Sequence, residues 1–461
     1  MLKTTTNHRR LVTLATAGIG AVLLMSACSA PGTSDTKTTD PGNSTSGATS
    51  TAASGTPSCG TEPVTLKAYI ETGFPMTGLL FDEFEDQFPN VTVDVREDQF
   101  AVITQNAPRI LADDPPDIMR LPQMSELASE GLLMDLDGYA ADFGWDQWPA
   151  SQLEQLRVAE DGTRGTGPLY GMGLNFSMTG VFYNKDHAAT IGMTEAPKTL
   201  AEFDELLAKA KDAGITPIMQ FNGGATGGFA FPLQNLMASY GDVGPINDWI
   251  YLKPGASINT ESNLKAAEHM QGWVESGYFT EDANSLDYPM VMSRFLGGDG
   301  LFTFTGDWES GNFDTNMAGK VGFFLFPPAE AGGKYGAMSA PLTYGVSAYA
   351  ENPDCAAFFF DWVATNDEAR TIAVQSGGSH PMGPADAFMP EVDPGTTTGE
   401  TLTAGAQIVA DNGAMDFIAN ATGAIYAQSW TPNLQKLMAG EQTAAGLLES
   451  VQADYEQQIA G

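Results

Sequence analysis

The sequence predicts a protein of the α/β class, and two observations near its start carry that prediction. Residues 64–70 have the composition of a β-strand, and valines alternate over residues 91–95 as in a second strand. Between them, residues 78–88 repeat apolar side chains at helical spacing, and Pro89 ends the repeat. A strand–helix–strand unit predicts a sheet with helices packed on its faces.

The same order of elements recurs later in the chain. Residues 200–213 form a helical pattern that Gly214 ends, and residues 215–220 read as the strand that follows. Apolar residues at helical spacing over residues 434–438 and 447–455 predict two helices near the C-terminus. The chain shows no short internal repeat.

Length, charge and cysteine content exclude several classes of function. The chain has 461 residues, 21 Lys and Arg against 57 Asp and Glu, and a net charge of −36. Nucleic-acid binding needs clustered basic residues, so this class is disfavoured, as is docking on an anionic membrane by charge. The three cysteines lack the spacing of a metal centre. We therefore expect no metal and no cofactor.

The first 27 residues have the features of a secretory signal. Basic residues precede an apolar run, Leu11–Met25, that is too short to span a bilayer, and small residues follow it. The end of the run, Leu24 to Cys28, resembles a bacterial lipoprotein signal, which implies lipidation of Cys28. Loss of residues 1–27 removes three basic residues and would take the net charge to −39. The alternative is an ordinary signal peptide with Cys28 incidental.

Residues 28–63 are predicted to be a flexible tether. Of the 34 residues from Ser29 to Glu62, 28 are Ser, Thr, Gly, Pro or Ala. No aliphatic or aromatic side chain larger than Ala occurs there, so nothing offsets the entropy of ordering the segment. With a lipidated Cys28, this arrangement predicts an exported protein anchored to the outer face of the cell membrane.

A family resemblance is carried by a series of segments after the tether, which are Val181–Asp186, Ala196–Glu202, Phe295–Trp308, Tyr344–Ser347, Cys355–Arg370, Gly377–Met382, Trp430 and Gly440–Leu448. Together they resemble the extracellular solute-binding proteins of bacterial ABC importers, in the carbohydrate-binding branch that includes maltose-binding protein. Leu200 departs from this pattern, because the family usually has Trp there.

The resemblance implies a two-lobed, type II periplasmic-binding-protein-like fold with a ligand cleft between hinged lobes. Lobe 1 would comprise residues 64–182 and 347–392, and lobe 2 residues 183–346 and 393–461. It also implies a function: a monomer captures a neutral mono- or oligosaccharide by lobe closure and delivers it to the membrane subunits of an ABC importer. A sensor role, with delivery of ligand occupancy to a membrane receptor, is an alternative.

A sugar site needs flat apolar surfaces for C–H faces and fixed hydrogen-bond partners for hydroxyls. By resemblance, Trp308 and Trp430 would stack on the sugar. Core packing is the alternative for each candidate, and it is as well supported as binding for Phe229. The candidate substrate-binding residues are Glu71, Arg120, Gln123, Asn175, Asn222, Phe229, Asp307, Trp308, Tyr344 and Trp430.

Two further predictions concern cysteine pairing and catalysis. Cys59 and Cys355 would lie outside the cytoplasm, where disulfides persist, and either pair or remain free thiols. A secreted hydrolase is the rival class, since acidic pairs such as Asp113–Asp114 are easy to find in so acidic a chain. No Gly-x-Ser-x-Gly elbow and no P-loop occur in suitable contexts, so we expect no enzyme.

Overall fold

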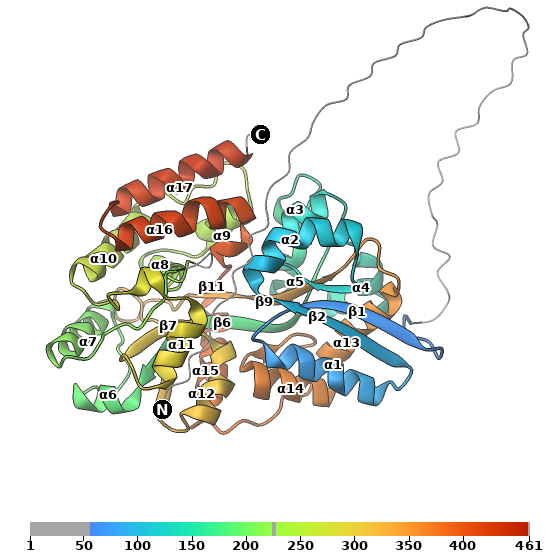
Figure 1. Cartoon of the computed structure of the whole chain (residues 1–461), viewed down its shortest axis with the longest axis horizontal. Coiled ribbons are helices and arrows are strands. Elements are labelled where there is room, and N and C mark those ends of the chain that lie inside the picture. Colours follow the sequence, from blue (N-terminus) through green and yellow to red (C-terminus); the bar gives the residue numbers. More distant parts are fainter. Residues whose placement is uncertain (1–55, 224–226, 460–461) are drawn as a thin grey trace, which may run out of the picture. The chain divides into compact units, whose positions relative to one another are not determined.

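The computed structural model describes residues 56–223 and 227–459. The predicted signal peptide, the lipidation of Cys28 and most of the predicted tether lie outside these residues. Figure 1 labels many of the helices and strands along the chain. The strands are β1 Val64–Glu71, β2 Val91–Asp98, β3 Ile118–Arg120, β4 Arg157–Val158, β5 Arg164–Leu169, β6 Met172–Asn184, β7 Phe302–Gly306, β8 Val321–Phe324, β9 Ala337–Val346, β10 His380–Pro381 and β11 Ala414–Met415.

Helices occupy most of the remaining described chain. The α-helices are α1 Pro75–Gln87, α2 Phe100–Asp113, α3 Met124–Ser129, α4 Asp137–Phe143, α5 Ala150–Leu153, α6 Lys185–Thr190, α7 Leu200–Asp212, α8 Ala230–Tyr240, α9 Gly244–Ile250, α10 Glu261–Glu275, α11 Tyr288–Leu296, α12 Ser310–Asn316, α13 Pro353–Thr365, α14 Asp367–Gly377, α15 Thr397–Asp411, α16 Thr431–Met438 and α17 Ala444–Ile459. Short helical turns matter at two places, the 3₁₀ turn η4 Asp307–Glu309 and the π-helix η6 Ile425–Trp430.

The α/β class is confirmed, and most predicted elements are present. Strands β1 and β2 pair in parallel around α1, as the strand–helix–strand pattern requires. Helices α7, α16 and α17 lie where the periodicity placed them. The predicted strand over residues 215–220 is wrong: only Ile218 forms isolated bridges there. Pro217 has no N–H to donate, which interrupts the ladder.

Two long strands join the two parts of the sheet. The strand order is β10-β6-β9-β3-β1-β2, with β11 beside β9 and with β7 and β8 beside β6. The first half of β6 pairs with β9 and β10, and its second half pairs with β7 and β8. The neighbours of β6 change between Met178 and Thr179. Met178 pairs with Ser339 of β9, and Thr179 pairs with Gly306 of β7. In Figure 1, β6 and β9 run between the two sets of helices.

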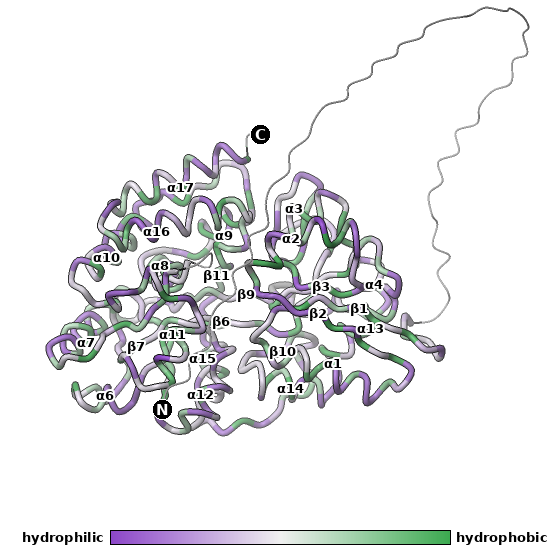
Figure 2. Tube along the Cα trace, in the orientation of Figure 1, coloured by the Kyte–Doolittle hydropathy of each residue, from purple (hydrophilic) through white to green (hydrophobic). Residues whose placement is uncertain are grey.

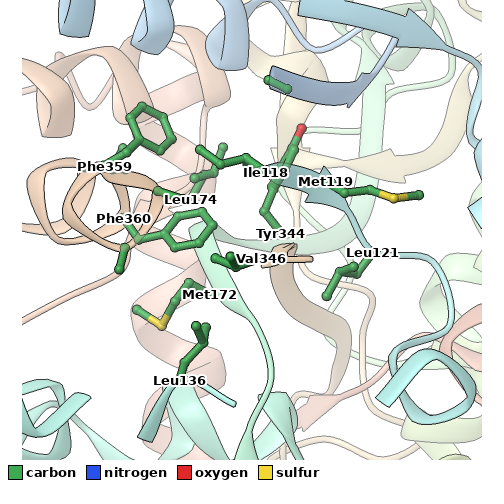
Figure 3. Close-up of a cluster of buried hydrophobic side chains, with 14 of the residues drawn as sticks. Ile118, Met119, Leu121, Leu136, Met172, Leu174, Tyr344, Val346, Phe359 and Phe360 are labelled. Atoms are coloured by element: carbon green, nitrogen blue, oxygen red, sulfur yellow. The ribbon is translucent and has the colours of Figure 1, made fainter. Parts of the chain in front are cut away.

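Hydrophobic side chains form separate interiors on either side of these strands, and we name the lobes by them. The first lobe has one cluster, drawn from residues 59–174 and 342–382. Figure 3 shows part of it, with Phe359 and Phe360 of α13 facing Leu174 and Val346 of the two long strands. The second lobe has two clusters, drawn from residues 178–338 and 408–455.

Along β6 and β9, the side chains pass from the core of one lobe to the core of the other a few residues before the predicted lobe boundaries. Leu174 is the last residue of β6 in the first-lobe core, and Met178 already belongs to the second, whereas the expected limit was residue 182. In β9, Leu342 is already in the first-lobe core, before the expected limit at residue 346. Both strands continue unbroken through the crossing, so the sequence contains no local signal for it.

Cys59 and Cys355 form a disulfide bond, which was one of the two outcomes left open. Cys59 is buried in the first-lobe core, and Asn90 Nδ2 donates to the carbonyl oxygens of Gly60 and Glu62. The predicted tether to residue 63 is therefore too long, because the chain is attached to the body from Cys59 onward. The bond links residues 296 positions apart in the sequence.

Hydropathy along the chain follows this division into interiors and surfaces. Figure 2 shows hydrophilic and hydrophobic residues alternating along α1 and α17, as expected of helices with one buried side. In the described ranges, no helix has both the length and the apolar composition needed to cross a bilayer.

Candidate functional site

Trp308 lies just after strand β7, on the turn η4, where the sheet passes from one lobe to the other. The last residue of β7, Gly306, pairs with Thr179 at the crossing point of β6. The indole folds back over Gly306, and a Cβ at position 306 would overlap its six-membered ring. Any larger residue at 306 would therefore displace the ring. The Trp308 side chain remains partly exposed.

Aromatic rings from both lobes surround the Trp308 indole. Its ring centroid lies 6.4 Å from that of Phe74, in the first-lobe loop between β1 and α1. On the second-lobe side, the centroids of Phe231 in α8 and Phe417 after β11 lie 6.2 Å and 6.3 Å away. We call these four residues the ring cluster. It is a place where partly buried aromatic surface of both lobes meets.

A hydrogen-bonded chain holds the indole N–H. Trp308 Nε1 donates to the Tyr288 hydroxyl at 2.7 Å, and that hydroxyl lies 2.6 Å from Glu309 Oε1 and 2.9 Å from Thr305 Oγ1. Asn312 Nδ2 donates to Glu309 Oε2 at 2.8 Å. Burial, and next the charge of Glu309, raise the pKa of Tyr288 well above its usual 10. The hydroxyl therefore keeps its proton at neutral pH.

Asp307 lies at the point where β6 exchanges its neighbours. Its side chain is 2% exposed, and its Oδ2 accepts the backbone N–H of Met178 at 3.1 Å. Met178 lies in β6 between the residues that pair with β10 and the residues that pair with β7. Burial raises the pKa of Asp307 well above its usual range, opposed first by a hydrogen bond from Ser379. Its Oδ1 has no hydrogen-bond partner in the described part of the chain.

Asn175 belongs to the same polar group. The Ser177 hydroxyl lies 3.3 Å from both Asn175 Oδ1 and the Ser379 hydroxyl, and Asn175 Nδ2 lies 3.4 Å from Met76 Sδ. Asp307 lies beside this group, because its Oδ2 accepts the N–H of Met178, the residue after Ser177. Asn175, Ser177, Ser379 and Asp307 are all buried. We call these four residues the polar floor. It brings together two predicted site residues, Asn175 and Asp307.

Glu71 and Arg120 form an ion pair in the first lobe. Arg120 Nε lies 3.1 Å from Glu71 Oε2. The Arg120 side chain is 13% exposed and the Glu71 side chain is 14% exposed. Arg120 also donates to the carbonyl oxygens of Leu121 and Thr343, and its guanidinium carbon lies 5.1 Å from the centre of the Phe100 ring. Burial raises the pKa of Glu71, and the Arg120 charge opposes that change. The pair has no net charge when both groups are ionised.

Gln123 and Tyr344 are both buried. Gln123 follows β3, and its side chain lies close to Gly423 of the second lobe. If residue 423 had a Cβ, that atom would be only 3.0 Å from the Gln123 side chain. It therefore packs against the other lobe. The Tyr344 hydroxyl lies 3.3 Å from Thr77 Oγ1, and burial raises the pKa of Tyr344 to about 12. Tyr344 belongs to the first-lobe core and is labelled in Figure 3.

Asn222, Phe229 and Trp430 are not brought into this group. All three have 0% exposure, and Phe229 and Trp430 belong to the second-lobe interior. The Phe229 centroid lies 4.4 Å from that of Phe279, and Asn222 Nδ2 donates to Asn284 Oδ1 at 2.7 Å. Their surfaces are already occupied by the lobe itself. In this conformation their side chains contact the lobe itself and not the ring cluster, so these three assignments stay predictions.

Several residues of the site were not found from the sequence. Phe231 lies two positions after the candidate Phe229, and α8 begins between them, so one ring faces the core and the other faces Trp308. Tyr288 and Phe417 come from separate segments with no local motif. A pair of phenylalanines two positions apart, at residues 229 and 231, is the one signal that pointed close to the right place.

An ion pair between the lobes was also missed. Arg164 of β5 lies 2.7 Å from Asp416, and their side chains are 5% and 0% exposed. Arg164 also donates to the carbonyl oxygen of Asn420 and lies 4.9 Å from the centre of the Tyr251 ring. Asp416 precedes Phe417, so this pair and the ring cluster share one second-lobe segment.

The ring cluster and the polar floor are distinct from the hollows on the surface. A hollow of about 380 Å³ lies in the first lobe and is lined by Phe143, Gly144, Gln147, Trp148, Thr365, Pro384, Ala385 and Asp386. It shares no lining residue with either group. Within the described ranges, no three His, Cys, Asp or Glu side chains gather closely enough to hold a metal ion.

Comparison with known proteins decides the family. Residues 64–370 match the family described as bacterial extracellular solute-binding protein, which is more than half of the chain. The chain belongs to this family. The resemblance read from the sequence is thus confirmed, and this solute-binding protein has the two-lobed fold of its structural neighbours.

Individual relatives are more distant. A probable sugar-binding periplasmic protein of Mesorhizobium japonicum is 28% identical over 41% of this chain. The chain spans 43% of that relative's length, less than half. Among solved structures, a chitin oligosaccharide binding protein has a TM-score of 0.69, 20% identity, and coverage of 87% of this chain and 100% of its own. Maltose-bound MalE3 of T. maritima has a TM-score of 0.70, 15% identity, and coverage of 86% and 100%. At these identities the structures show the fold alone.

Proposed function

We propose that this solute-binding protein captures a neutral mono- or oligosaccharide between its lobes, at the ring cluster and the polar floor. The observation that carries the proposal is the position of Trp308. Its indole is partly exposed, meets rings of both lobes, and follows directly on Asp307 of the polar floor. A flat apolar surface beside buried hydrogen-bonding groups is the combination that a sugar needs.

The charges at the site support a neutral ligand. Arg120 is paired with Glu71, so its positive charge is already compensated. Asp307 and Glu309 are acidic residues and supply no positive charge. An anionic sugar would therefore find no uncompensated positive partner among these groups, whereas a neutral sugar needs none. The names of the relative and of the two solved structures, which specify sugars or oligosaccharides, support the same ligand class.

Binding between lobes would favour closure, because only a closed conformation makes ligand contacts from both sides. A ligand with micromolar affinity would supply about −8 kcal/mol, part of which shifts the open–closed balance. The closed protein would then present one surface, formed by both lobes, to the membrane subunits of an ABC importer. Small-angle scattering should show compaction when a confirmed ligand is added. Unchanged dimensions would contradict the closure step.

The proposed location is the outer face of the cell membrane, through a lipid on Cys28. Each buried CH₂ of an acyl chain contributes about 0.8 kcal/mol to membrane affinity. Replacing Cys28 with Ala should release the protein from the membrane fraction. Retention of the Cys28→Ala variant in that fraction would disprove the lipid anchor without affecting the sugar-binding proposal.

A thermal-shift screen over sugars and polyols tests the ligand class. A ligand that binds only the native state raises its stability by RT ln(1 + [L]/Kd), about 2.7 kcal/mol when the ligand is present at 100 times Kd. We expect a neutral mono- or oligosaccharide to raise the melting temperature of the mature protein. If only amino acids, peptides or polyamines do so, the proposed ligand class is wrong. Amino acids at the same concentrations serve as the matched control.

A further inference from the structure

We infer that Tyr288 and Glu309 are positioning residues that hold the Trp308 indole in its ligand-binding orientation, so that Trp308 offers a ligand its ring face and not its N–H. The inference deepens the proposed function and rests on it for the role of Trp308. Its physical basis is the hydrogen-bonded chain from Trp308 through Tyr288 to Glu309.

The direction of donation in this chain is fixed by the chemistry of its two ends. An indole N–H can only donate, and an ionised carboxylate can only accept. The Tyr288 hydroxyl, with a single proton, must therefore accept from Trp308 Nε1 and donate to Glu309 Oε1. Thr305, whose hydroxyl lies 2.9 Å away, is left to donate to the remaining lone pair of Tyr288. Each group thus has one role, which gives the indole one preferred orientation.

Both positioning residues are themselves held in the second lobe. Glu309 is 9% exposed, and Asn312 Nδ2 donates to its second carboxylate oxygen. The Tyr288 ring meets the Phe221 ring edge-on, with centroids 5.3 Å apart. The second lobe therefore fixes the indole before any contact with Phe74 of the first lobe is made. A pre-oriented ring loses less entropy when a ligand binds.

This arrangement has a consequence for specificity. The Trp308 N–H is already used by Tyr288, so it is not available to a sugar hydroxyl. Its contribution to binding would come from contact between the indole face and the C–H face of a sugar. Discrimination among sugar hydroxyls would then depend on groups other than this N–H.

The positioning role is tested first without any ligand. In protein labelled with ¹⁵N-tryptophan, the indole ¹H–¹⁵N resonance of Trp308 is assigned by its loss in Trp308→Phe. Tyr288→Phe removes the acceptor of this N–H, so the Trp308 resonance should move and exchange faster with water. Tyr139→Phe is the matched control, because it also removes a hydroxyl that donates to a carboxylate, that of Asp354 in the first lobe. It should leave the Trp308 resonance in place.

An unmoved Trp308 resonance in Tyr288→Phe would overturn the inference, as would an equal movement in Tyr139→Phe. Glu309→Gln provides a second variant should Tyr288→Phe not fold. It keeps an acceptor oxygen but removes the charge, so a smaller movement of the same resonance is expected. None of these readouts depends on sugar binding.

The effect on binding is measured by titration calorimetry with maltotriose and raffinose. For a sugar that binds the wild-type protein, Tyr288→Phe should weaken binding by about 2- to 10-fold, the worth of one hydrogen bond, and Tyr139→Phe should not. Equal affinity of the two variants for that sugar would overturn the inference. If neither sugar binds the wild-type protein, the NMR comparison still decides whether Tyr288 positions the ring, and the sugar screen decides the proposed function separately.

Discussion

Trp308 and Trp430 are the same residue type, and both are preceded by a polar residue, but the structure gives them opposite environments. Trp308 is partly exposed, and its N–H donates to a tyrosine. Trp430 is fully buried, and its Nε1 has no hydrogen-bond partner among the described residues. Only Trp308 is in contact with a ring of the first lobe.

The difference comes from the elements that carry the two rings. Trp308 follows a strand that ends at the crossing between the lobes, so its side chain meets residues of both. Trp430 ends the π-helix η6 and leads directly into α16, whose buried residues belong to the second-lobe interior. Polar neighbours in sequence therefore do not decide exposure. The position of the element in the fold does.

The largest expected effect separates the two residues by stability. Trp430→Ala should lower the free energy of unfolding by about 3–5 kcal/mol, because it leaves a large cavity in the second-lobe interior. Urea denaturation measures this, with Trp308→Ala as the comparison. A cost below 1 kcal/mol for Trp430→Ala would show that this indole is not packed as the structure has it.

The second prediction reverses the ranking of the two residues, with ligand affinity as the readout. Trp308→Ala should weaken binding of a sugar found in the thermal-shift screen by roughly 30-fold or more, equivalent to the 2 kcal/mol of a binding hot spot. Its cost in stability should be smaller than that of Trp430→Ala because the side chain is partly exposed. Calorimetric titration of the folded variants checks this. An unchanged affinity would remove Trp308 from the site.

Much of the fold could be predicted because its signals are local. Apolar spacing identified α7, α16 and α17, strand-like composition identified β1, and alternation identified β2. The predicted strand over residues 215–220 was wrong because Pro217 limits pairing there. The crossing point was placed several residues late because β6 and β9 pass between the lobes without a break in sequence pattern.

The site could be predicted only in part, because its members come together from distant segments. Asn175 and Asp307 were candidates and lie near one another in the polar floor, because Ser177 lies 3.3 Å from Asn175 Oδ1 and the next residue, Met178, donates its N–H to Asp307. The partner of Trp308, Tyr288, was not found, because a tyrosine at a helix start has no pattern that reports its hydrogen bond. Phe229 was a candidate and Phe231 was not, although α8 turns only the latter towards Trp308.

A third prediction tests the close packing under the exposed indole. Gly306→Ala should cost about 1–3 kcal/mol of stability, the usual range for overpacking, because the new methyl group would overlap the Trp308 ring. Gly272→Ala, in the interior of α10 with open space around it, is the control and should stabilise by roughly 0.5–1 kcal/mol. If both substitutions stabilise the protein, the indole does not rest on Gly306.

The smallest expected effect is a pH dependence of the folding stability that comes from Asp307. This carboxylic acid directly precedes Trp308, whereas a serine precedes Trp430. Burial raises the pKa of Asp307 in the folded state, so as pH rises above its ordinary value of 3.8 the unfolded chain loses the proton first. The wild-type protein therefore loses stability over that window, until the pH passes the folded-state pKa. Asp307→Asn cannot titrate and should be more stable than the wild type at pH 7, by about 1 kcal/mol, with the difference vanishing near pH 3.5. Urea denaturation of both proteins from pH 3.5 to 7 measures it, since carboxylates that they share cancel in the comparison. A difference independent of pH would mean that the Asp307 carboxyl is solvated, and that the polar floor beside Trp308 is open to water.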